Sequence, residues 1–164
     1  MILKGSASSV TSATDLSRAT RIRVAATNAG TVTVAATLGT FNAQSAVAAA
    51  AITVTSHGFI TGDQVTYAGA DAIAELTDGA DYYVIKVDAN TVNLTTTHHD
   101  AADGINALTL TDGGTSENHT ITAVNTYAGT VVLIQNDVIL IDKKPGDTIA
   151  AGAAMSMTSI GNQP

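Results

Sequence analysis

Short runs in which Thr, Val and Ile recur at alternate positions dominate this sequence. Each run is bounded by Gly, Asn or Asp. The pattern is typical of half-buried strands joined by tight turns. The runs occupy residues 20–27, 31–37, 51–55, 64–68, 81–87, 90–96, 107–111, 119–124, 130–135 and 137–142. The sequence therefore predicts an all-β fold, a small antiparallel β-sandwich or barrel.

Three polar breaks have the length of hairpin turns, namely Asn28–Gly30, Asp88–Asn90 and Gln135–Asp137. Asn, Asp and Gly tolerate positive φ, so we expect antiparallel neighbours on either side of each break. The Ala-rich segment Ala43–Ala51 is too short for a stable isolated helix, and a linker or a lead-in strand suits it at least as well.

The character of the chain changes twice, which predicts two modules. The chain between the Ala-rich segment and Asn125 contains turns with Gly and Asp, and all four His. After Asn125, the sequence returns to plain strand patterns and to Lys. We expect an outer β-sandwich domain from residues 1–42 plus 125–164, interrupted by an inserted β-module, residues 43–124. Such insertions are tolerated when their ends emerge close together.

Composition excludes several classes of function. Cys is absent, so neither disulfides nor thiolate chemistry can occur. A net charge of -7 with seven Lys and Arg gives no footprint for phosphate backbones, and we expect no nucleic-acid partner. No export signal or long apolar stretch is apparent, so we expect a product made in the cytoplasm, with no membrane partner and no cofactor.

The predicted core is thin, because much of the 45% hydrophobic content is Ala and aromatic residues are only 4%. Association with partner chains would add burial, so we expect a homo-oligomer or a form bound to another protein. The two ends of the chain carry apolar side chains with little charge, the composition of an interface centre. The candidate interface residues are Met1, Ile2, Leu3, Ile149, Met155, Met157 and Ile160.

The stretch Asn93–Gly104, NLTTTHHDAADG, crowds imidazoles and carboxylates together. Adjacent His98 and His99 would point to opposite faces of a strand, and the mixed ligand set suits neither zinc nor a hard cation well. Because the stretch follows a predicted strand and precedes Gly104, we interpret it as a solvated turn and expect no metal site.

His57 and His119 bracket the inserted module. A neutral imidazole can donate at one ring nitrogen and accept at the other, so we expect a structural role in tying turns to strands. The alternative would place both around a ligand with Asp63. The acidic residues fall mainly in turns, where hydrogen bonds to the backbone explain them. No catalytic residues are predicted, and we expect that the protein is not an enzyme.

Parts of the inserted module resemble a β-module that recurs in bacteriophage structural proteins and in some large bacterial surface proteins. The matching segments are His57–Asp63 (HGFITGD), Leu76–Gly79 (LTDG), Tyr82–Val84 (YYV), Asp88–Thr91 (DANT) and His119. The match covers most of the module and implies no single function.

The outer domain resembles small proteins encoded among the virion genes of tailed phages, especially those of cyanobacteria. Lys143–Ile149, KKPGDTI, carries this resemblance most strongly, and its Pro-Gly pair predicts a type II turn. The resemblance implies a virion structural protein, which we expect to be a capsid decoration or cement protein on the outer surface of the phage head. Its partners would be the major capsid protein or other virion proteins. The alternatives are a tail, neck or fibre component and a carbohydrate-binding adhesion module.

Overall fold

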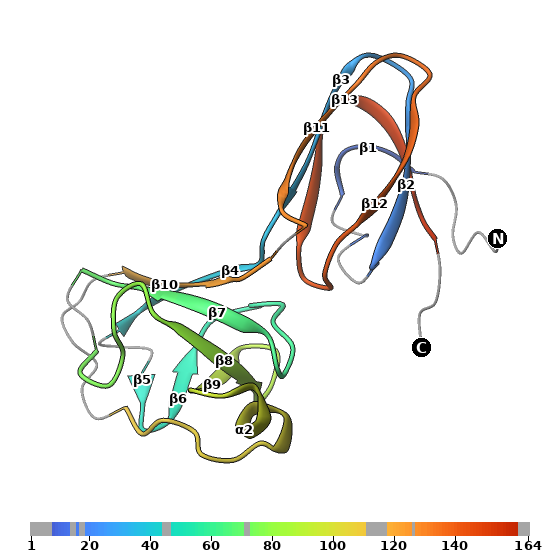
Figure 1. Cartoon of the computed structure of the whole chain (residues 1–164). Coiled ribbons are helices and arrows are strands. Elements are labelled where there is room, and N and C mark those ends of the chain that lie inside the picture. Colours follow the sequence, from blue (N-terminus) through green and yellow to red (C-terminus); the bar gives the residue numbers. More distant parts are fainter. Residues whose placement is uncertain are drawn as a thin grey trace. The chain divides into compact units, whose positions relative to one another are not determined.

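The computed structural model describes residues 8–13, 16, 19–43, 47–70, 73–110, 118–125 and 127–160. The chain divides into two compact units, an outer unit of residues 1–36 and 125–164 and an inserted unit of residues 37–124. Nearly all regular structure in both is antiparallel β-sheet, which confirms the predicted all-β class (Figure 1). No helix in the part of the chain that the structure describes is long and apolar enough to cross a membrane.

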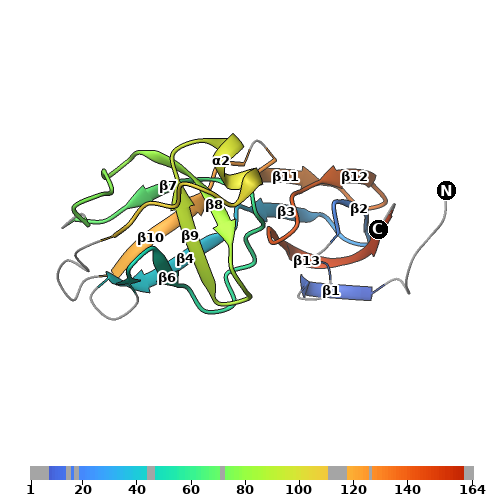
Figure 2. The same cartoon turned by 90° about the horizontal axis from the view of Figure 1, so that it is seen from below.

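The outer unit is one antiparallel sheet whose strands follow the order β11-β3-β13-β2-β12, with β1 also paired to β13. Figure 2 shows β1 alongside β13. The strands are β1 (Ser8–Ala13), β2 (Arg21–Ala26), β3 (Gly30–Ala35), β11 (Gly129–Leu133), β12 (Val138–Asp142) and β13 (Thr148–Ser159).

Two of the three predicted hairpin turns are instead bends in continuous ribbons. One half of β13 pairs with β3, Ile149 opposite Val34, and the other half pairs with β2, Met157 opposite Val24. Likewise, β11 pairs with β3 and β12 with β2. The breaks at Asn28–Gly30 and Gln135–Asp137 therefore bend the sheet into the arch seen in Figure 1, and the strands on either side of each break do not pair with each other.

Gly30 allows the ribbons to approach closely at this bend. A Cβ atom at Gly30 would lie 2.8 Å from Cβ of Ala153 and 3.1 Å from Cε of Met155. Asn136 adopts a φ of 75° on the neighbouring ribbon. The backbone N–H of Ala26 donates to Asp137 across the bend, and that of Asn136 donates back to Ala26. Hydrogen bonding between the two ribbons continues through this break. The polar residues that tolerate unusual backbone angles therefore form a bend here and not a hairpin turn.

The side chains inside the arch form the core of the outer unit. Three residues predicted to lie at an interface belong to this core, so the prediction is corrected for them. Ile149, Met155 and Met157 are at most 2% exposed and pack with Ile22 and Val24. They were expected at a surface because the C-terminal segment has almost no charge, but alternate positions of β13 face inward, so the same composition forms a core. Ile160 is half-buried, and Met1, Ile2 and Leu3 lie outside the described residues.

The inserted unit is a seven-stranded antiparallel sheet in the order β4-β10-β7-β8-β9-β6-β5. Its strands are β4 (Leu38–Asn42), β5 (Val47–Ala48), β6 (Ala51–Thr53), β7 (Gln64–Ala68), β8 (Asp81–Lys86), β9 (Thr91–Thr95) and β10 (Asn118–Ala123). Its buried side chains include Phe59, Tyr67, Ile73, Leu94 and Ile121. The predicted hairpin at Asp88–Asn90 is confirmed, because Lys86 of β8 pairs with Val92 of β9.

The first joint between the units lies at residues 36 and 37, six residues before the predicted one. The cause is β4, which pairs along its whole length with β10, so that Leu38 lies opposite Thr122. The N–H of Ala123 donates to the carbonyl of Thr37 at 2.8 Å, which closes the unit where the chain enters and leaves it. Within the Ala-rich segment, Ala48 pairs with Ala51, so this stretch contains a tight hairpin and leads into β6.

Candidate functional site

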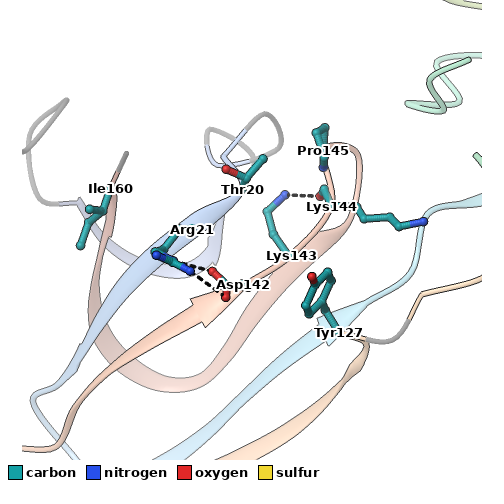
Figure 3. A pocket seen from close by; sticks show the side chains of 8 residues that line it. All are labelled: Thr20, Arg21, Tyr127, Asp142, Lys143, Lys144, Pro145 and Ile160. Carbon is teal, nitrogen blue, oxygen red and sulfur yellow. Dashed lines mark hydrogen bonds and ion pairs between the residues drawn. The ribbon is translucent and has the colours of Figure 1, made fainter. Parts of the chain in front are cut away.

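A pocket of about 600 Å³ lies in the outer unit, where β2 begins and β12 ends (Figure 3). Its lining combines a half-exposed aromatic ring, three cationic side chains and a carboxylate. The lining residues are Thr20, Arg21, Tyr127, Asp142, Lys143, Lys144, Pro145 and Ile160.

Arg21 and Asp142 form the charged wall of this pocket. They are paired residues of β2 and β12, and Nε and Nη2 of Arg21 donate to the two carboxylate oxygens at 2.6 and 3.1 Å. This bidentate hydrogen bond raises the pKa of Arg21 and lowers that of Asp142. Both side chains remain about half exposed, so their outer edges are accessible to a ligand.

Lys143 and the following turn form the floor. Lys143 is 2% exposed, and its ammonium donates to the carbonyl of Lys144 at 3.0 Å. Burial lowers the pKa of Lys143, while the charge of the nearby Asp147 acts in the opposite direction. The predicted type II turn is confirmed, with Gly146 at a φ of 89° and the N–H of Asp147 donating to Lys144.

The buried carboxylate of Asp147 fixes this turn. It accepts hydrogen bonds from the N–H of Lys144 at 2.8 Å and from the side-chain amide of Asn125. The side-chain oxygen of Asn125 accepts in turn from the N–H of Tyr127, which orients the backbone that carries the ring. The turn and the aromatic residue are thus held by one hydrogen-bonded chain.

Such a pocket can bind a small polar ligand or an anionic group. Three of the chain's seven Lys and Arg residues line it, in a protein of net charge -7. A ring that is 51% exposed, beside a paired guanidinium and carboxylate, also provides the stacking surface and hydrogen-bonding groups that a sugar ring requires. The geometry assigns no reaction to these groups.

The stretch Asn93–Gly104 does not form the predicted solvated turn. His98–Asp103 is a short helix, α2, and Thr97 is its N-cap, with its hydroxyl oxygen accepting from the N–H of Asp100 at 3.1 Å. Gly104, at a φ of 68°, ends it. The sequence T-x-x-D followed by Gly is a capping pattern that could have predicted the helix.

The two imidazoles of α2 have different contacts. The ring of His98 meets the ring of Tyr83 edge-on at 5.8 Å, whereas His99 lies 3.5 Å from the carboxylate of Asp103 on an exposed surface. Among the residues that the structure describes, no group of three or more His, Asp or Glu side chains is arranged to hold a metal ion.

His57 joins a loop to the β8–β9 hairpin. Its Nδ1 accepts from the N–H of Phe59 at 3.0 Å, so its Nε2 carries the proton and donates to the carbonyl of Asp88 at 3.0 Å. The imidazole is 4% exposed, and burial lowers its pKa. Both nitrogens are engaged, as a structural role requires.

His119 lies in the core of the inserted unit. Its Nδ1 is hydrogen-bonded to the hydroxyl of Tyr67, which also accepts from the N–H of Ile73 at 3.2 Å. The ring packs against Phe41. Its Nε2 has no hydrogen-bond partner among the described residues. The two His side chains have separate partners, and neither is bonded to Asp63, whose carboxylate accepts from the N–H of Ile60 at 2.9 Å.

The pocket could not be predicted from the sequence because its residues come from distant segments of the chain. Lys143 and Lys144 are adjacent charged residues in the sequence, which gives no sign that Lys143 is buried. Tyr127 precedes β11 and lines the pocket. Its position two residues after Asn125, outside the alternating run, was the available signal. Comparison with protein-family models, curated proteins and solved structures found no match.

Proposed function

We propose that this protein is a structural component of a tailed-phage virion, a decoration or cement protein on the outer surface of the head. The outer unit would attach to the major capsid protein or another virion protein, and the inserted unit would face outward. The observation that carries the proposal is the division into two units, each with its own sheet, joined where β4 and β10 pair. An attachment domain that displays a second module has this organisation.

Three further features support the proposal. Acidic side chains of the inserted unit are used in turns, as in the bonds from Gly69 N–H to Asp78 and from Asn90 N–H to Asp88. The resemblance of the KKPGDTI segment to virion proteins supports the location. An acidic protein also suits the outside of the head, because a protein lining packaged DNA would face phosphate repulsion.

Location on the particle is the direct test. Gold-labelled antibodies against the inserted unit should decorate the heads of purified particles, at many sites per head. Label restricted to tails or necks would favour the alternative virion positions, and absence of the chain from purified particles by mass spectrometry would refute the proposal.

Replacement of residues 37–124 by a short Gly/Ser linker tests the division of roles. The bond between Ala123 and Thr37 brings the joints together, so a short linker suffices. The shortened chain should still join the particle. Val24→Lys, a charge introduced at a fully buried position of the outer unit, is the control that should abolish incorporation.

The pocket favours one second candidate, a carbohydrate-binding role. Tyr127 would stack on a sugar ring, and Arg21 and Asp142 would bond to its hydroxyls. Glycan-array binding should be lost in Tyr127→Ala and retained in Tyr127→Phe, which keeps the ring. Equal array signals from the wild type and Tyr127→Ala would exclude this role for the pocket.

A further inference from the structure

The outer edge of the outer unit carries an unusually apolar ribbon, formed by residues 127–142. More than half of the exposed large apolar side chains that the structure describes belong to it, and they are 44–74% exposed. They are Tyr127, Val131, Val132, Ile134, Val138 and Leu140. Together they expose on the order of 500 Å² of apolar surface, as much as the largest patch on a typical monomer.

This ribbon is also an unpaired sheet edge. Within the described chain, β11 pairs with β3 alone and β12 with β2 alone, so alternate backbone N–H and C=O groups face away from the sheet. Proteins protect such edges with Lys, Pro or inward-pointing charges. Residues 129–141 contain neither Lys, Arg nor Pro, and their one charge, Asp137, accepts a bond from the N–H of Ile134 within the bend.

We propose that this edge pairs with the same edge of a second copy of the chain, forming a closed two-fold dimer. Two copies of a protein with net charge -7 repel each other except where their surfaces are neutral, and this ribbon is such a surface. In an isologous antiparallel pair, each outward N–H meets an outward C=O of the other copy. With the axis beside Asn136, Val132 of one copy lies opposite Leu140 of the other.

The exposed apolar area is a large part of the roughly 800 Å² that one partner contributes to an interface of standard size. Backbone hydrogen bonds and the flanking polar groups would complete the contact. The two ends of the ribbon, Tyr127 and Asp142, also line the pocket. The inserted unit is not needed for the dimer, and the inference does not depend on the virion assignment.

Light scattering during size-exclusion chromatography tests the proposal on the full chain at about 1–100 µM. The wild type should be a dimer at the upper concentration. Val132→Lys with Leu140→Lys should weaken the dimer at least about a hundredfold, because each copy then places two charges in a desolvated contact. Val87→Lys with Ile105→Lys, exposed apolar positions of the inserted unit, adds the same charge and should leave the dimer intact.

Val132→Thr with Leu140→Thr places a β-branched residue, which suits a strand, at both positions and should also weaken the dimer if the Lys variant fails to fold. Amide hydrogen exchange should show slower exchange of alternate amides of β11 and β12 in the dimer than in the dilute monomer. A wild type that is monomeric at 100 µM, open-ended aggregation, or equal weakening by the control pair would each overturn the proposal.

Discussion

Met155→Ala should destabilise the outer unit strongly and leave the inserted unit unchanged. Met155 is 1% exposed and lies in the middle of β13, opposite Ala26 of β2. The substitution removes three heavy atoms, each worth about 0.8 kcal/mol when buried, and leaves a cavity beside Gly30. We expect a loss of about 3 kcal/mol, equivalent to roughly 10–20 °C in the unfolding temperature of a unit of this size.

The assay is differential scanning calorimetry, because two units with separate cores should give two transitions. Val84→Ala is the matched control, since Val84 is fully buried in β8 of the inserted unit and should shift only the other transition. A neutral Met155→Ala would mean that the C-terminal strand is not part of the core, and would restore its original assignment as an interface. Equal shifts of both transitions would mean that the chain unfolds as one unit.

Three further predictions concern the inserted unit. Burial lowers the pKa of His57 in the folded state, so protonation favours unfolding. The stability that depends on the neutral imidazole is therefore complete above about pH 6.5 and is lost as pH falls below it. Urea unfolding should show a smaller loss of stability between pH 7 and 5.5 in His57→Gln than in the wild type, and equal losses would contradict this. Gly69→Ala should cost about 1–3 kcal/mol by the same assay, since its Cβ would overlap the imidazole of His119, whereas Gly129→Ala, with open space around it, should be near neutral. Thr97→Ala should cost about 1 kcal/mol through loss of the helix cap, more than any exposed His substitution in α2, and a neutral effect in urea unfolding would refute the capping role.

The strands could be predicted from the sequence because alternation is a local property. The predicted runs at residues 20–27, 81–87 and 137–142 each contain a strand. The second joint, at residue 125, also coincided with a change of local composition. The first joint did not, because β4 belongs to the inserted unit only through its pairing with β10, which is distant in the sequence.

Pairing between distant segments also explains the other differences. Asn28–Gly30 has the composition of a hairpin turn, yet β13 runs along both flanking strands and makes the break a bend. The C-terminal segment has the composition of an interface, but its inward-facing residues pack against β2 and β3. For the candidate site, the type II turn was predictable from Pro145-Gly146, whereas its meeting with Arg21 and Tyr127 depends on tertiary structure.

We propose that the outer unit attaches the protein to the outside of a phage head. Cryo-electron microscopy of the intact particle tests it most directly. We predict density for this chain on the outer surface of the capsid, with β2, β3 and β11–β13 against the shell or a neighbouring copy and β7–β9 of the inserted unit facing solvent. Density with the inserted unit buried against the shell and the outer unit in solvent, or density for the chain in the tail, would contradict this attachment.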